Sequence, residues 1–236
     1  METTKNKLTI HQLFWYFVLF SVIGLIVETT YGFITTGILE SRKGLIWGPF
    51  CPVYGVGATL LIILLNQVNQ KSYFKLFLYG VLIGSIVEYL LSYGLEAVFG
   101  TRFWDYSYTN NDINGRICIT YSFFWGVLAV LLMKLIKPIL DKLIDQISLK
   151  IKTPIEVSLF IFLVIDALMS VWAIHTYEKR AISEYYKETV QYSDVSWMRK
   201  IEEEYFTNER MQKIFPNLRT QDREGNQVFV RDLLIK

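Results

Sequence analysis

The sequence predicts an all-α membrane protein, a polytopic helical bundle of about five transmembrane helices with a charged, helical C-terminal tail. Of its 236 residues, 52% are hydrophobic and 16% are aromatic, which is typical of a membrane protein. The apolar residues form five runs of the length that crosses a bilayer, about 20 residues. Most charged residues lie after Tyr177 or in the short connections between the runs.

The five apolar runs are the expected membrane spans, and they cover Leu13–Thr35, Pro49–Val68, Phe74–Phe99, Ile117–Ile136 and Val157–Tyr177. The second starts with the letters GPFCPVYGVG, whose prolines and glycines favour an irregular or re-entrant beginning. The lysine-rich connection 134–153 has apolar residues at helical spacing. An interfacial helix and a simple extension of the fourth span both fit it.

Two domains are expected, a transmembrane domain over residues 1–177 and a polar, largely helical tail over residues 178–236. In the tail, apolar residues recur at helical spacing from Ile182, and a second helix is expected from about Val195 to just before Pro216. The last 20 residues fit either a small folded cap or a frayed end.

Composition excludes several function classes. The formal net charge is only +2 and no basic face is evident, so nucleic acid is not an expected partner. Cys51 and Cys118 are too few for a disulfide framework, and neither has the spacing of a metal site, so we expect no metal and no cofactor. The expected partner is the lipid bilayer.

An internal repeat is visible in the first and third spans. Residues 23–28 read IGLIVE and residues 83–88 read IGSIVE, so five of six positions are identical and Glu28 matches Glu88 at an offset of 60. The following spans also match, because Tyr54-Gly55-Val56 corresponds to Trp125-Gly126-Val127 at an offset of 71. The second copy therefore has about eleven additional residues in its connecting loop.

We interpret these matches as a parallel duplication of two helices, with repeat 1 over about residues 13–68 and repeat 2 over about 74–136, followed by a fifth helix at 157–177. Two helix pairs in the same orientation would place both connecting loops on one side of the membrane. The alternative is that apolar segments share short matches by chance.

The third span carries small and polar residues at every fourth position, namely Gly80, Gly84, Glu88, Ser92 and Glu96. On a helix they form one stripe. A charged side chain near the bilayer centre costs roughly 2.5–3.5 kcal/mol, so we interpret Glu28, Glu88 and Glu96 as candidate ligands of a substrate or ion. Arg42 and Arg116 are the candidate counter-charges. Pairing of these acids with arginine only to fix helix packing is the alternative.

The loop before the fourth span is rich in hydrogen-bonding and stacking groups, and its candidate binding residues are Trp104, Asp105, Tyr106 and Asn114. The loop could fold back to cap a polar cavity, or it could form an interfacial aromatic belt with Arg and Asp in solvent. We favour the cap, because the turn-forming pieces Asn-Gly-Arg and Gly-Pro-Phe-Cys-Pro stand at equivalent ends of the two repeats.

Together these motifs resemble the CmpB-like family of bacterial ABC-transporter type IV permeases. The resemblance rests on the segment from Arg42 to Ala58, on Glu88 and Glu96, on the WDYS letters at 104–107 and on NGRIC at 114–118, and it covers roughly residues 10–136. It implies a multi-pass protein of a bacterial cell membrane. The sequence has no Walker A motif, so any ATPase would be a separate subunit. A second copy of the chain is also open as a partner.

Three function classes remain. The first is a transporter permease component with a polar intramembrane site between the two repeats. The second is a membrane enzyme acting on a lipid-linked substrate, with carboxylates as acid and base and arginines holding a phosphate. No Ser/His/Asp, Cys/His or metal-spaced set supports an enzyme, and we expect no catalytic residues. The third is a structural or regulatory membrane protein that binds a partner with its tail.

Overall fold

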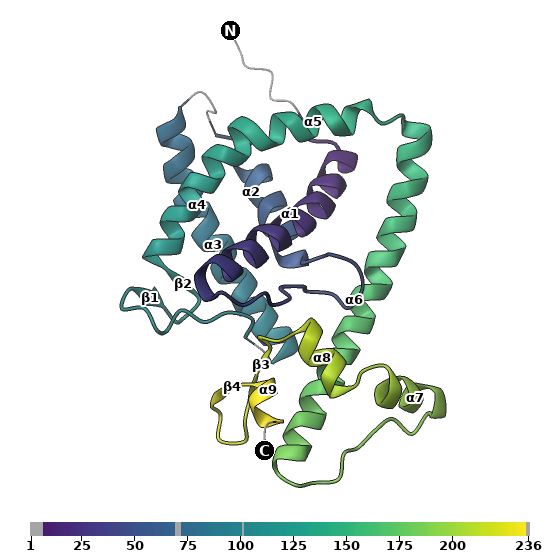
Figure 1. Cartoon of the computed structure of the whole chain (residues 1–236). Coiled ribbons are helices and arrows are strands. Elements are labelled where there is room, and N and C mark those ends of the chain that lie inside the picture. The colour runs from purple at the N-terminus through teal and green to yellow at the C-terminus, as the bar shows by residue number, and fades with distance from the viewer. Residues whose placement is uncertain (1–6, 69–71, 101, 235–236) are drawn as a thin grey trace. The chain divides into compact units, whose positions relative to one another are not determined.

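The computed structural model describes residues 7–68, 72–100 and 102–234, and it is built mainly of helices (Figure 1). The membrane part contains α1 (Ile10–Thr36), α2 (Pro52–Leu65), α3 (Tyr73–Phe99), α4 (Ile119–Leu131), the π-helical turn η1 (Leu132–Ile136), α5 (Lys137–Gln146) and α6 (Leu149–Tyr185). The tail adds α7 (Ser196–Glu204), α8 (Asn208–Ile214) and α9 (Val230–Leu233). The predicted all-α membrane architecture is confirmed.

Within the described residues, four rather than five helices are long and apolar enough to cross a membrane. They are α1, the part Tyr73–Ala97 of α3, the continuous helix Ile119–Gln146 and α6. The second expected span is a helix of only 14 residues, α2. At about 1.5 Å per residue α2 is about 21 Å long, less than the roughly 30 Å of bilayer hydrocarbon. Residues 37–51 before it form no helix, which is the irregular start that its prolines and glycines favour.

The lysine-rich connection extends the fourth span. The chain stays helical from Ile119 through η1 and α5 to Gln146, and Figure 1 shows α4 and α5 as one rod that changes direction. A π-helical turn is a common cause of such a bend. Pro138 stands at the start of α5, where a missing backbone N–H is tolerated. The fifth helix is longer than expected, since α6 begins at Leu149.

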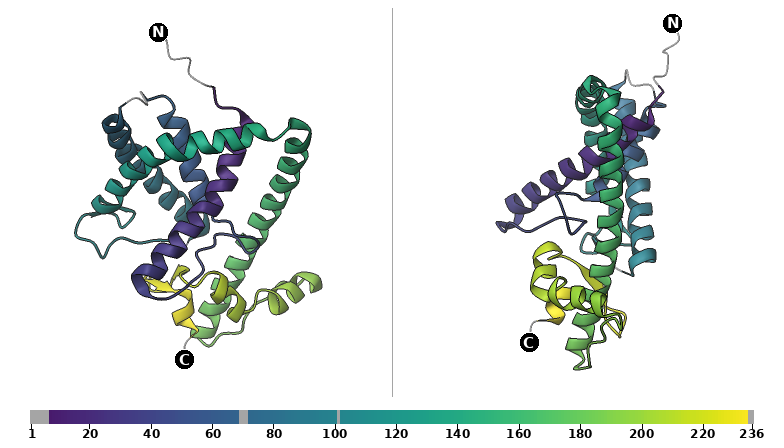
Figure 2. Two further views of the ribbon diagram at one scale, coloured as in Figure 1. Left: turned by 45° about the horizontal axis from the view of Figure 1, so that its top comes forward. Right: turned by 90° about the vertical axis from the view of Figure 1, so that its right-hand side faces the viewer.

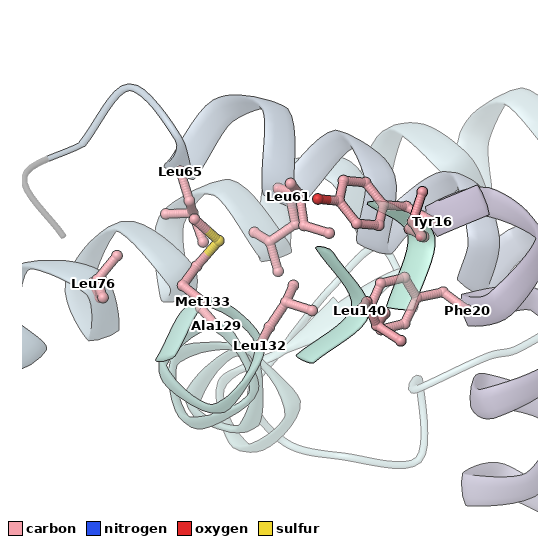
Figure 3. Packing of buried hydrophobic residues seen from close by; sticks show 11 residues of the cluster. Tyr16, Phe20, Leu61, Leu65, Leu76, Ala129, Leu132, Met133 and Leu140 are labelled. Carbon is pink, nitrogen blue, oxygen red and sulfur yellow. The ribbon is translucent and has the colours of Figure 1, made fainter. Parts of the chain in front are cut away.

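Contacts divide the chain into two compact units. The first contains the described residues up to Gly24, Pro52–Tyr93 and Trp104–Ile161, and the second contains Leu25–Cys51, Gly94–Phe103 and the described residues from Phe162 onward. In the first unit, Tyr16 and Phe20 of α1 pack with Leu61 and Leu65 of α2, Leu76 of α3, Ala129 of α4, Leu132 and Met133 of η1, and Leu140 of α5 (Figure 3). This apolar cluster joins all the helices of both proposed repeats.

Glycines allow the helices of the first unit to approach closely. A Cβ atom at Gly84 would lie 2.6 Å from Cβ of Trp125, so α3 and α4 touch where the glycine has no side chain. At the matching position of the other pair, a Cβ at Gly24 would meet Cβ and Cγ of Tyr54. Small residues at such crossings let helix backbones approach.

The contacts of a second glycine pair also match. A Cβ at Gly55 would meet Phe17 and Ser21, and a Cβ at Gly126 would meet Phe77 and Val81. Phe77 and Val81 are the residues that an offset of 60 pairs with Phe17 and Ser21. The two helix pairs therefore use equivalent residues for equivalent contacts, which supports the internal repeat.

The second unit contains the tail, which is only partly helical. Residues 186–195 form no helix, and two helices, α7 and α8, follow before Pro216. The last part is a folded cap, in which the hairpin of β3 (Arg219–Gln221) and β4 (Gln227–Phe229) leads into α9. Leu218, Val230 and Leu233 pack with Ala173 and Tyr177 of α6, and Figure 2 shows this cap beside the C-terminal part of α6 in both views.

A buried carboxylate fixes the irregular segment before α2 to α6 within this unit. Asp166 is fully buried, and its Oδ1 accepts hydrogen bonds from the Trp47 backbone N–H (3.1 Å) and from the Ser170 hydroxyl (3.3 Å). The Ser170 hydroxyl oxygen in turn accepts from the Ile46 N–H at 2.9 Å. Asp166 thus provides acceptors for a backbone segment that has no helical hydrogen bonds of its own.

We predict that Gly84→Ala lowers the stability of the protein by about 1–3 kcal/mol, because the added methyl group would overlap Trp125. Gly94→Ala is the matched control, since Gly94 lies in the same helix and a Cβ there would meet nothing within 4 Å. That control should be neutral or stabilising by up to about 1 kcal/mol. Thermal unfolding of the detergent-solubilised variants measures both effects, and equal midpoints for the two variants would contradict the packing described here.

Candidate functional site

Glu88 is the centre of a polar cluster in the first unit. It lies on α3 one turn after Gly84, and only 8% of its surface is exposed. Its Oε1 accepts a hydrogen bond from the Tyr106 hydroxyl and its Oε2 accepts one from the Trp125 indole N–H, both at 2.9 Å. Within the described ranges Glu88 forms no ion pair. Its two oxygens are therefore held by neutral donors.

The loop between α3 and α4 positions Tyr106. The Tyr106 N–H donates to the Gly115 carbonyl at 2.8 Å, and the Trp104 indole donates to the Arg116 carbonyl at 3.1 Å. The Tyr106 ring stacks on Tyr121 of α4, with centroids 4.8 Å apart. Burial, followed by the nearby Glu88 carboxylate, raises the pKa of Tyr106 well above its usual range, so its hydroxyl remains a donor at neutral pH.

A short hairpin closes the same loop. Strands β1 (Asp112–Ile113) and β2 (Ile117–Cys118) pair antiparallel, and Asn114 and Gly115 in the turn have φ angles of 55° and 67°. Asn and Gly are the residues that adopt such left-handed conformations most readily. The Asn-Gly-Arg letters therefore form the tight turn that the sequence indicated, and the turn directs Arg116 back toward α3.

Arg116 is buried against the stripe of α3. It is 9% exposed, and its guanidinium donates to the Ser92 hydroxyl at 3.1 Å. The guanidinium also lies over the rings of Tyr89 and Tyr93, at 5.8 and 5.4 Å from their centroids. Cation–π contacts of this kind stabilise a desolvated arginine. Arg116 thus binds the polar stripe of α3 one turn after Glu88, and in place of the ion pair that the sequence suggested, Arg116 contacts Ser92 while Glu88 accepts from Tyr106 and Trp125.

The other loop residues of the predicted site have local roles in the structure. The Asp105 carboxylate accepts from the N–H and the hydroxyl of Ser107, at 3.0 and 2.6 Å, which forms an Asx turn. The Asn114 amide donates to the Tyr89 hydroxyl at 3.0 Å. The first unit therefore gathers six of the predicted residues: Glu88, Trp104, Asp105, Tyr106, Asn114 and Arg116.

The remaining three predicted residues belong to the second unit. Glu96 pairs with Arg102 at 3.2 Å, so its cation is a residue that the sequence interpretation did not single out. Arg42 lies 3.8 Å from Glu40. Glu28 is half-buried on α1.

Arg42 nevertheless has a position that matches Arg116 in the repeat. Its guanidinium nitrogen would lie 3.3 Å from a Cβ at Gly32, and Gly32 matches Ser92 at the offset of 60. Each arginine is therefore placed against the helix position one turn after the matched glutamate. The alignment of the two loops did not give this equivalence, because Arg42 and Arg116 are 74 positions apart.

Sequence reasoning missed four aromatic residues of the cluster: Tyr89, Tyr93, Tyr121 and Trp125. The first two are four positions apart on α3 and flank the polar stripe, a spacing that could have marked them as one ring pair. Tyr121 carries no such signal, since aromatic residues are common at the start of a membrane span.

The cluster combines a buried carboxylate with two neutral donors, which orient its oxygens. Acidic side chains inside a membrane protein are rare and often functional. In the part of the chain that the structure describes, no group of three or more His, Cys, Asp or Glu side chains could hold a metal ion.

We predict that Tyr106→Phe destabilises the protein by about 1–3 kcal/mol, because it leaves the buried Oε1 of Glu88 without its donor. Tyr108→Phe, in the same loop, is the matched control. Tyr108 is 74% exposed, and its substitution should change stability by less than about 0.5 kcal/mol. Unfolding midpoints in detergent measure the difference. Equal effects of the two substitutions would show that the hydrogen bond of Tyr106 does not stabilise the folded protein.

Comparison with known proteins identifies the family. A family model described as "Putative ABC-transporter type IV" (CmpB) matches residues 15–171, a range that includes every residue of the Glu88 cluster. No curated protein and no solved structure matches the chain. Since the match covers more than half of the chain and the structure contains four helices of spanning length, this multi-pass membrane protein belongs to the CmpB family of ABC-transporter type IV proteins.

Proposed function

We propose that the chain is the permease component of a transport system and that the Glu88 cluster binds a transported cation or a coupling proton. The observation that carries this proposal is the pair of neutral donors, Tyr106 and Trp125, on a buried carboxylate. A glutamate in a permanent ion pair has its charge already compensated. Glu88 has neutral donors instead, so its carboxylate is open to a proton or a cation, while its hydrogen bonds hold it in a fixed orientation.

Arg116 has a supporting part in this proposal. Its fixed positive charge is held one turn from Glu88 by Ser92 and two tyrosine rings. A second positive charge near Glu88 would therefore bind less tightly than it would at an isolated carboxylate, which favours release as well as binding. Glu28 and Arg42 are proposed as the counterparts of this pair in the first repeat. An ATPase that drives transport would be a separate subunit, as the family name implies.

The test is a Glu88→Gln variant in proteoliposomes. Glutamine has the same shape and can keep both hydrogen bonds, because its oxygen can accept from Trp125 while the Tyr106 hydroxyl accepts from its amide. The fold should be retained. Proton and monovalent-cation fluxes, measured with ion-sensitive dyes, should fall to the level of protein-free vesicles.

Glu209→Gln provides the control. Glu209 lies on α8 and its side chain is 81% exposed, and it pairs only with Lys213 four positions away, so its neutralisation should leave the fluxes unchanged. Wild-type flux in Glu88→Gln together with wild-type stability would overturn the proposed role of Glu88. A wild-type flux no higher than that of protein-free vesicles would also contradict cation or proton transport by this chain alone.

A further inference from the structure

Helix α7 is fixed beside the end of the apolar part of α6, and both belong to the second unit. The Trp172 indole of α6 donates to Glu202 of α7 at 2.9 Å, and the Trp172 ring meets the Trp197 ring edge-on at 6.2 Å. Further along α6, the buried Arg180 guanidinium donates to the carbonyl oxygens of Glu202 and Phe206, both at 2.7 Å. These contacts hold α7 to α6 between Trp172 and Arg180.

The exposed face of α6 changes from apolar to polar residues close to Trp172. Leu168 and Val171 are exposed apolar residues at 67% and 42%, and the exposed residues one and two turns later are His175 and Lys179. Because α6 is long and apolar enough to span a membrane, we expect the boundary between hydrocarbon and water between Val171 and His175. Trp172 is within three residues of that expected boundary, a rise of about 4.5 Å. The contacts of Trp172 with α7 would then place α7 near the membrane surface.

The exposed residues at the start of α7 have the composition of an interfacial helix. Val195 and Trp197 are exposed, Trp197 at 60%, and the exposed Arg199 and Lys200 follow directly. Tryptophan gathers at membrane interfaces because its ring is apolar while its N–H is polar, and basic side chains bind lipid phosphates. Glu202 of α7 is buried, and so is Phe206, two residues after the end of the helix.

We propose that α7 lies in the headgroup layer of the bilayer, with Val195 and Trp197 in contact with lipid and Arg199 and Lys200 at the phosphates. The exposed apolar stripe of α6 reaches Val171, and the Trp172–Trp197 contact continues it onto α7, which favours lipid over a soluble protein as the occupant. This proposal depends on the membrane-spanning character of α6 and is independent of the role of Glu88.

Photo-crosslinking of the wild-type protein tests it directly. The full chain is reconstituted into phosphatidylcholine nanodiscs that contain a phosphatidylcholine with a diazirine on its acyl chain, and the crosslinked peptides are mapped by mass spectrometry. We expect lipid adducts on the peptide that contains residues 195–200. The charged turn of the β3–β4 hairpin, residues 221–227, should carry several-fold fewer adducts. Equal labelling of the two segments would overturn the proposal.

A matched pair of spin labels gives a second measurement. Cysteines are introduced by Ser196→Cys in α7 and Glu224→Cys in the hairpin turn, two exposed positions, while the native Cys51 and Cys118 are buried. The label at 196 should be several-fold less accessible than the label at 224 to a water-soluble nickel chelate, and more accessible to oxygen. Equal nickel accessibility would contradict a lipid contact, and protection at 196 that persists in lipid-free amphipol would show that a protein surface covers α7 instead.

Discussion

The site depends on the absence of a side chain at Gly84. Because nothing projects from α3 at that position, the Cβ of Trp125 can lie against the helix backbone, and the indole N–H then reaches Glu88 one turn further on. A side chain of any size at position 84 would move α4 away from α3. The orientation of the buried carboxylate is therefore set by a packing contact rather than by an opposite charge.

Close packing at glycines also supports the internal repeat. Tyr54 packs against Gly24, and its match Trp125 packs against Gly84. The residues that pack against Gly55 and Gly126 are also paired by the offset of 60. Matches between apolar letters arise easily by chance. Contacts among five pairs of matched residues do not, because each contact depends on two positions. The geometry therefore supports a duplication more strongly than the letters alone.

Sequence reasoning could find the membrane class and much of the Glu88 cluster, because composition, span length and the stripe on the third span are local signals. It could not find that α2 is short, since apolar letters continue on both sides of Pro52 while the backbone from 37 to 51 is fixed instead by Asp166 and Ser170 of α6. Nor could it assign the partner of each charge. Glu96 pairs with Arg102, six positions further along the chain, a cation that the interpretation of Arg42 and Arg116 as counter-charges left out.

The additional residues of the second loop make the two repeats unequal. Tyr106 and Trp104 lie in the segment that repeat 2 has in excess of repeat 1, so the donor to Oε1 of Glu88 has no sequence counterpart for Glu28. Trp125, in contrast, has a counterpart in Tyr54. A pair of symmetric carboxylates would bind a ligand equally in both repeats. Because one loop supplies a buried tyrosine whose hydroxyl stays protonated at neutral pH, the two glutamates have different environments. The duplication thus provides the helix pairs, and the longer loop makes the surroundings of Glu88 different from those of Glu28.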